Sequence, residues 1–254
     1  MTGYEYACRG YLLLKKSPKY RPLNSSPRFW AFDSLHWLLS GPYAVIAGVL
    51  IGGSILHGPL QRVLATPMAL AFIIVGVVFV VNGIAVQQKW RLRYFRMSSF
   101  VKGALTPPIT YSIIEDAVAV DGGGGRRYRS ALMTRYSASP KFRALLRHMT
   151  WFWGIPSLVI GVVLLALIFT VKREVAYGLG WGLPAVWAGI WVLMTIFWVR
   201  RVLRDEERDW EGPVWLEGGA DADAEVVEGQ GGAGGGGEMG MEQGNRGAVS
   251  GTTV

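Results

Sequence analysis

Four long runs without a charged residue limit what this chain can fold into more than any other feature. Residues 37–56, 63–86, 149–171 and 175–199 contain no Asp, Glu, Lys, Arg or His. At about 1.5 Å per residue, each run is long enough as a helix to cross a hydrocarbon core of about 30 Å. We expect helices because a segment in lipid must satisfy its own backbone hydrogen bonds. The sequence therefore predicts an all-α membrane protein with four transmembrane helices.

The remaining composition excludes several classes of protein. Of the 254 residues, 51% are hydrophobic and 17% are charged, and the chain has one cysteine and three histidines. So few thiols and imidazoles exclude a disulfide framework and a Cys-rich zinc site. Outside the enzyme alternative given below we expect no metal centre, and the sequence identifies no cofactor. Proton pumps and ion-coupled carriers keep ionisable residues at membrane depth. The four runs have none, which argues against these transporters.

The Lys and Arg residues predict the orientation of the helices. The N-terminal segment carries six, the central loop twelve and the residues after the fourth run, 200–254, five, against one and two in the short connections between the runs. Loops rich in Lys and Arg stay on the cytosolic side of a membrane. We therefore expect both termini and the central loop in the cytosol, where the acceptor motif at Asn24 receives no glycan.

The chain divides into five segments by composition. A cytosolic N-terminal segment, 1–36, precedes the first expected transmembrane hairpin, 37–88. A cytosolic loop, 89–148, then leads to a second hairpin with a helical extension, 149–210. The tail, 211–254, has 14 glycines and eight acids against a single Arg246. A segment of this kind buries too little apolar area to offset its ordering entropy, so we expect it to be disordered.

Small residues recur within the runs at the spacing of helix contacts. Because lipid is as apolar as leucine, close backbone approach at such residues is a main source of helix association in membranes. We expect helix–helix seams at Ala44, Gly48, Gly52, Ala69, Gly76, Gly83, Gly154 and Gly161.

The central loop is expected to be a small α/β unit. Apolar residues alternate at Ile109, Tyr111 and Ile113, which favours short strands near 109–114, 117–121 and 126–132. A helix is then expected to begin at Ser139-Pro140, a favourable N-cap and N1 pair, and to continue into the third run.

The strongest chemical grouping in this loop consists of acids, four consecutive glycines and arginines. Its members are Glu115, Asp116, Asp121, the glycines at 122–125, Arg126 and Arg127. In an enzyme, the carboxylates would bind metal or act as acid and base, and the two arginines would hold phosphate. The alternative is a solvated turn in which the glycines supply positive φ.

Two further sets of residues are candidates for lipid contact. Near the start of the loop, Arg91, Arg93 and Arg96 alternate with aromatic residues, which suits anionic headgroups on the cytosolic side more than nucleic acid. In the fourth run, Trp187, Trp191 and Trp198 recur at helical spacing. They form either ordinary aromatic packing or a wall for an apolar ligand.

Two functions fit these features. The first is a non-catalytic scaffold, accessory or lipid-contacting protein with a basic cytosolic face, and a protein partner is compatible with it. The alternative is a small membrane enzyme that acts on a lipid or isoprenoid at the cytosolic interface with Glu115, Asp116 and Asp121.

Overall fold

The computed structural model describes residues 3–14, 19–24, 32–55, 61–94 and 96–210, and nearly all of these are helical. In chain order the elements are α1 (Gly3–Leu14), α2 (Ser34–Ile55), α3 (Gln61–Leu64), α4 (Pro67–Gln87), α5 (Ile109–Asp116), the π-helix η1 (Ala117–Asp121), α6 (Gly125–Ala138), α7 (Pro140–Thr170) and α8 (Arg173–Trp210). The tail expected to be disordered, 211–254, lies outside the described residues.

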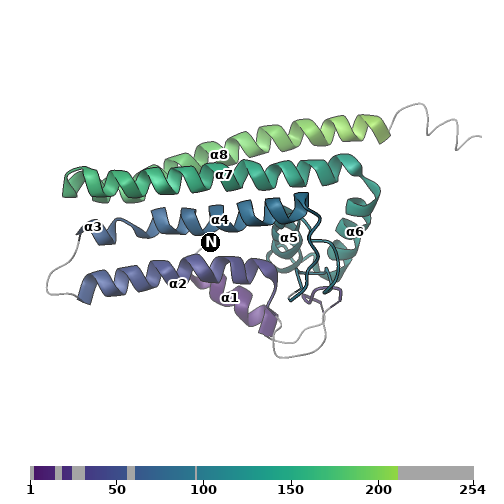
Figure 1. Cartoon of the computed structure of the whole chain (residues 1–254). Helices are drawn as coiled ribbons and strands as arrows, with labels where there is room; N and C mark the ends of the chain where they lie inside the picture. Colours follow the sequence, from purple (N-terminus) through teal and green to yellow (C-terminus); the bar gives the residue numbers. More distant parts are fainter. Residues whose placement is uncertain (1–2, 15–18, 25–31, 56–60, 95, 211–254) are drawn as a thin grey trace, which may run out of the picture. The chain divides into compact units, whose positions relative to one another are not determined.

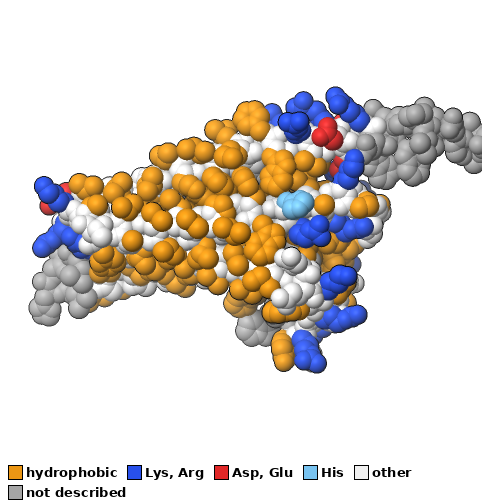
Figure 2. Space-filling view, turned by 45° about the horizontal axis from the view of Figure 1, so that its top comes forward, with side chains coloured by type: hydrophobic (Ala, Val, Ile, Leu, Met, Phe, Trp, Pro, Cys, Tyr) orange, Lys and Arg blue, Asp and Glu red, His pale blue; other side chains and the backbone are white. Residues whose placement is uncertain are grey.

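The prediction of four apolar helices is confirmed. By length and composition, α2, α4, α7 and α8 can each cross a membrane, and they lie side by side in Figure 1. On the face shown in Figure 2, hydrophobic side chains cover the middle of these helices, while Lys and Arg gather at the ends, chiefly at the end that holds α5 and α6. The chain is therefore an integral membrane protein. Its grouping into two hairpins stays a prediction.

The predicted seams are found between α4 and α7. A Cβ placed on Gly76 would lie 2.6 Å from the backbone N of Leu158, and one on Gly154 would lie 2.9 Å from Cβ of Phe79. Gly83 and Gly161 are equally tight, against Trp151 and Ile73. These glycines let the two backbones approach closely, which is how small residues stabilise helix pairs in lipid.

The predicted seam on the first run is not formed among the residues that the structure describes. No atom that a Cβ would meet lies within 4 Å at Gly48 or Gly52 of α2, and Ala44 is exposed. Periodic small residues thus mark a helix face that permits close approach, but they do not determine which faces are paired.

The predicted strands are wrong, and with them the α/β character of the loop. The ranges 109–114, 117–121 and 126–132 fall in α5, η1 and α6, and within the described residues the only β pairing is two isolated bridges. In α5 the apolar Ile109 and Tyr111 are buried, and so are the intervening Thr110 and Ser112. Because α5 buries both its apolar and its polar residues here, the alternation of apolar and polar residues does not distinguish a buried face from an exposed one.

The glycines form a tight turn between η1 and α6. Gly123 has φ +70° and Gly125 has φ +58°, which is the left-handed region that glycine enters without steric cost. The turn redirects the chain so that α6 packs beside α5. The expected N-cap at Ser139 is confirmed, because its hydroxyl accepts a hydrogen bond from the Phe142 N–H at 3.1 Å and α7 continues from there into the third span.

Candidate functional site

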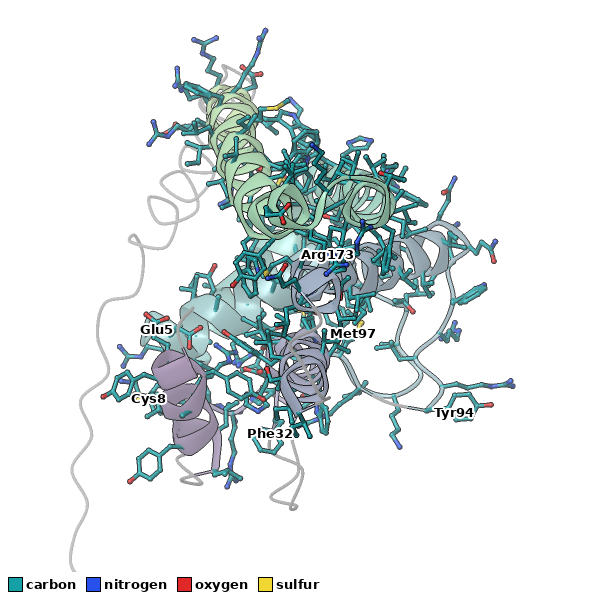
Figure 3. The ribbon with its side chains drawn as sticks, turned by 90° about the vertical axis from the view of Figure 1, so that its left-hand side faces the viewer. Glu5, Cys8, Phe32, Tyr94, Met97 and Arg173 are labelled. Atoms are coloured by element: carbon teal, nitrogen blue, oxygen red, sulfur yellow. The ribbon has the colours of Figure 1, made fainter. Side chains whose placement is uncertain are left out.

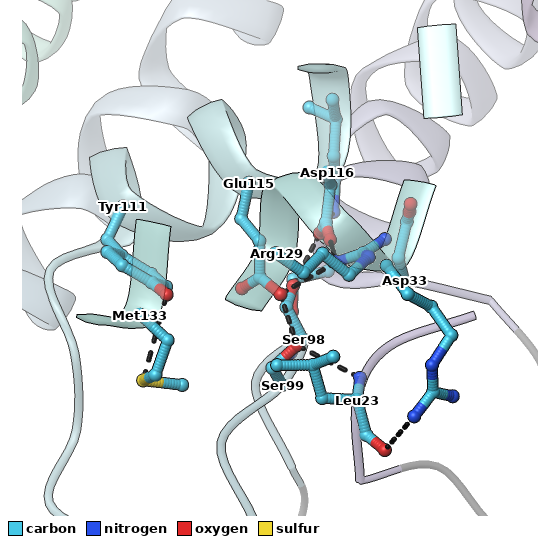
Figure 4. Close-up of polar contacts among 12 residues, drawn as sticks. Leu23, Asp33, Ser98, Ser99, Tyr111, Glu115, Asp116, Arg129 and Met133 are labelled. Carbon is cyan, nitrogen blue, oxygen red and sulfur yellow. Dashed lines mark hydrogen bonds and ion pairs between the residues drawn. The ribbon is translucent and has the colours of Figure 1, made fainter. Parts of the chain in front are cut away.

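A cluster of buried charged residues joins the helices at the end of the molecule that holds α5. Glu115 and Asp116, the last two residues of α5, are buried together with Arg129 of α6. One nitrogen of Arg129, Nη1, lies 2.8 Å from Glu115 and 2.7 Å from Asp116 (Figure 4). Arg129 also donates to the backbone carbonyl of Tyr20 at 3.3 Å. These contacts fix α6 against α5.

A second buried arginine brings the N-terminal helix into the same cluster. Arg9 of α1 pairs with Asp33 and Asp121, and it donates to the backbone carbonyl of Asp116 at 3.3 Å. Asp33 is buried, whereas the Asp121 side chain is 39% exposed. Arg9 therefore joins α1 to the start of α2, to α5 and to the outer edge of η1.

Two adjacent serines in the loop between α4 and α5 complete the cluster. The Ser98 hydroxyl donates to Asp116 and the Ser99 hydroxyl donates to Glu115. Ser99 also accepts a hydrogen bond from the Leu23 N–H at 3.1 Å, and its backbone carbonyl accepts one from the side chain of Asn24 at 2.9 Å. Two segments more than 70 residues apart in the chain thus meet at Ser99.

Burial governs the protonation of the carboxyl groups. It raises the pKa of Asp116 to about 6, and nearby Asp33 adds to this while Arg129 opposes it. Burial also raises the pKa of Glu115 and of Asp33, since a charged carboxylate loses its hydration. Among the described residues, Glu115 Oε2 has no hydrogen-bond partner, which favours its neutral form. The pKa of Arg129 is raised, because Asp116 and Glu115 outweigh the lowering caused by burial.

The structure brings together only part of the predicted catalytic grouping. Glu115 and Asp116 converge, but Asp121 pairs with Arg9 and lies outside them. Arg126 and Arg127, predicted to hold phosphate, are exposed on α6, and Arg126 donates to the backbone carbonyl of Leu23 at 3.2 Å. Within the described residues, no group of three or more His, Cys, Asp or Glu has a metal-binding arrangement.

The arginines that do bind the acids were missed by the sequence reasoning. Arg9 lies more than 100 residues from Asp116 and Asp121, and no local pattern marks such a pair. Asp33 directly precedes α2 and accepts a hydrogen bond from the His36 N–H at 2.9 Å, as an N-cap residue does. Its partnership with Arg9 left no signal in the sequence.

The loop from residue 88 to 108 carries the predicted headgroup arginines. Arg91 and Arg93 are exposed there beside the exposed rings of Trp90 and Tyr94, and Tyr94 lies at the outer edge of the loop in Figure 3. Arg91 also donates to the Gly103 carbonyl at 3.0 Å.

Arg96 differs from the other two headgroup arginines. It is half-buried, and burial lowers its pKa while Asp116 raises it. Arg96 thus lies within the electrostatic reach of the buried cluster, while Arg91 and Arg93 face outward.

The predicted aromatic wall packs against α7. Trp191 stacks on Trp187 at 5.0 Å and on Phe152 of α7 at 4.9 Å, and Trp198 meets the same Phe152 edge-on at 5.3 Å. The indole N–H of Trp191 donates to the Phe152 carbonyl at 2.9 Å. These rings hold α8 to α7, as expected if the tryptophans serve in ordinary aromatic packing. The alternative, that they form a wall for an apolar ligand, stays a prediction.

Comparison of the chain with protein families gives a match. A family model described as a domain of unknown function (DUF8766) matches residues 2–210. The match includes every helix described above and the whole buried cluster. No curated protein and no solved structure matches the chain.

Proposed function

Because the chain belongs to the family of the domain of unknown function DUF8766, its role has to be inferred from its own residues, and we propose that it is a non-catalytic, lipid-contacting membrane protein. Its basic end faces the cytosol and engages anionic headgroups or a protein partner. The observation that carries the proposal is the division of charge at this end: Asp33, Glu115 and Asp116 are buried and bound, whereas Arg91, Arg93 and Arg127 are exposed.

The contacts of the acids support a structural role for them. Asp116 is bound by Arg129, by Ser98 and by the Leu35 N–H, and Glu115 is bound by Arg129 and Ser99. An acid that binds a substrate or a metal needs an oxygen that the substrate or metal can reach. Glu115 Oε2 has no hydrogen-bond partner among the described residues, but it is buried. The alternative function, a membrane enzyme acting on a lipid or isoprenoid, requires these contacts to open.

The exposed cations supply the surface that the proposal needs. Arg93, which neighbours the exposed Tyr94 in the loop before α5, and Arg127 of α6 are both exposed at the same end of the helices. Cations at a membrane surface attract anionic lipid by about 1 kcal/mol each, and aromatic rings of this kind favour the interface.

The experiment measures which lipids stay bound to the protein. The chain is reconstituted in nanodiscs of mixed phosphatidylserine and phosphatidylcholine, released gently, and analysed by native mass spectrometry. We expect enrichment of phosphatidylserine on the unmodified protein and a several-fold loss of that enrichment in the double variant Arg93→Gln, Arg127→Gln.

The matched control removes two exposed cations from the opposite end of the helices, Lys172→Gln and Arg173→Gln. It should keep the enrichment. An unmodified protein that retains both lipids in the proportions of the nanodisc would contradict headgroup engagement.

A further inference from the structure

The N-terminal helix α1 has its polarity reversed with respect to a helix that meets water. Its Arg9 faces inward and is buried in the charged cluster. Its opposite face carries no charge. At 3.6 residues per turn, about one third of the circumference is occupied by Tyr4, Ala7, Cys8, Tyr11 and Leu14.

This outer face is accessible in the structure. Tyr4 is 78% exposed and Tyr11 is 62% exposed, and Leu14 is also exposed. Figure 3 shows Cys8 on the side of α1 turned away from the other helices. A soluble protein places the charged face of a surface helix outward and the apolar face inward, so α1 has the arrangement that suits an apolar surrounding.

The inner face of α1 fixes its depth relative to the first span. The Tyr6 ring stacks on His36 at 4.6 Å, and its hydroxyl is 2.7 Å from the Ser40 hydroxyl. A Cβ on Gly10 would lie 3.5 Å from the His36 ring. Both His36 and Ser40 belong to the first two turns of α2, so α1 lies beside the beginning of a membrane-spanning helix.

The span beside α1 also exposes an apolar side chain near its start. Trp37, in the turn of α2 that α1 contacts, is itself 53% exposed. Tyrosine and tryptophan are enriched at the level of the headgroups, where a ring with a polar end fits best. Lipid at the level of the headgroups therefore suits the aromatic and apolar side chains on the outer face of α1, and α1 lies at that level because it packs beside the start of α2.

We propose that α1 lies in the bilayer interface, with Tyr4, Ala7, Cys8, Tyr11 and Leu14 against lipid, and that the ion pairs of Arg9 hold it there from the inside. The N-terminal helix is then an interfacial anchor, and the charged cluster stays shielded beneath it. This placement does not depend on which headgroups the basic end prefers.

The test uses the single cysteine of the sequence. A nitroxide is attached to Cys8 of the full chain in nanodiscs, and collision rates are measured with oxygen, which concentrates in lipid, and with a nickel chelate, which stays in water. A second label at Ala7→Cys in a Cys8→Ser background repeats the measurement. The solvent control is Ser130→Cys in the same background, on the exposed side of α6.

We expect the oxygen-to-nickel collision ratio to be several-fold higher at positions 7 and 8 than at 130. A ratio at both positions equal to that at Ser130→Cys would overturn the proposal. Protection from both reagents, with dipolar broadening between labels on two chains, would also overturn it, because a second copy of the chain would then cover this face.

Discussion

Asp116 caps the first turn of α2 at Leu35, which lies 81 residues before it in the sequence. Its Oδ2 accepts a hydrogen bond from the Leu35 N–H at 3.1 Å, in the first turn of α2. The first N–H groups of a helix have no partner within the helix and carry a partial positive charge. Asp33 binds the His36 N–H of the same turn. The start of the first span and the charged cluster are therefore one structural unit.

Removing the Asp116 carboxylate should destabilise this unit strongly. In Asp116→Ala, the Leu35 N–H loses its acceptor and Arg129 keeps a single buried carboxylate, so we expect the free energy of unfolding to fall by about 3–5 kcal/mol. Asp116→Asn keeps an oxygen for Leu35 and should lose less. Thermal unfolding in detergent measures both. Asp205→Ala, at an exposed position of α8, is the control, and equal midpoints for Asp116→Ala and Asp205→Ala would contradict a capping role.

The raised pKa of Asp116 predicts an unusual pH dependence. The group binds its proton up to about pH 6 in the folded chain but only to about pH 3.9 when unfolded. Between these values Asp116 holds more protons in the folded state than in the unfolded state. The contribution of Asp116 to the free energy of unfolding therefore falls as the pH rises through this window and is constant above it. Glu115 and Asp33 shift in the same direction.

This dependence is measured as the unfolding midpoint of the unmodified chain and of Asp116→Asn between pH 4 and pH 8. The difference between the two proteins isolates one carboxyl group from all other titrating residues. We expect this difference to change across the window and to level off above about pH 7. A difference that is the same at every pH would show that Asp116 does not titrate there.

Arg129 and Arg127 offer a matched pair on one helix. Both are in α6, but Arg129 is buried between two carboxylates and Arg127 is exposed. Arg129→Ala leaves the buried charges of Glu115 and Asp116 without their shared partner, so the free energy of unfolding should fall by about 3–5 kcal/mol. Arg127→Ala should leave the unfolding midpoint unchanged. Comparable losses in the two variants would mean that the ion pairs do not hold α6.

The spans could be predicted from sequence because a single physical requirement determines them. A membrane helix must be apolar along its whole length, and this property is visible without knowing any neighbour. The start of α7 at Ser139-Pro140 was also predictable, since capping depends on residues within one turn.

The cluster was less accessible to prediction because its partners are distant in the chain. Glu115 and Asp116 attracted attention through the glycines that follow them, and the same glycines suggested Arg126 and Arg127. Helix α6 instead turns Arg129 inward. In α5, the buried Thr110 has a hydrogen-bond partner, because its hydroxyl donates to the Leu146 carbonyl of α7 at 2.7 Å. A polar residue satisfied in this way resembles an exposed one in the sequence, which is why a strand was predicted.

The α4–α7 seam predicts a contrast between two glycines. In Gly76→Ala the new methyl group meets the Leu158 backbone, which cannot rotate away, so we expect a loss of about 1–3 kcal/mol from overpacking. In Gly48→Ala the methyl group meets no atom of the described residues within 4 Å, and stability should be unchanged or slightly higher. Thermal unfolding in the same detergent compares them. A seam that tolerates Gly76→Ala as well as Gly48→Ala would not depend on close approach.

The orientation of the helices can be tested at the two ends that the structure separates. Cysteines placed at Ser130 on α6 and at Lys172 before α8, each in a Cys8→Ser background, are both exposed. If the basic end is cytosolic, a membrane-impermeant maleimide reaches Ser130→Cys only after the plasma membrane is opened. Lys172→Cys reacts in intact cells if the protein is at the cell surface, or only after internal membranes are dissolved if it is not.

The native acceptor at Asn24, whose amide is bonded to Ser99, should carry no glycan in either case, and a glycan there would place the basic end on the opposite side.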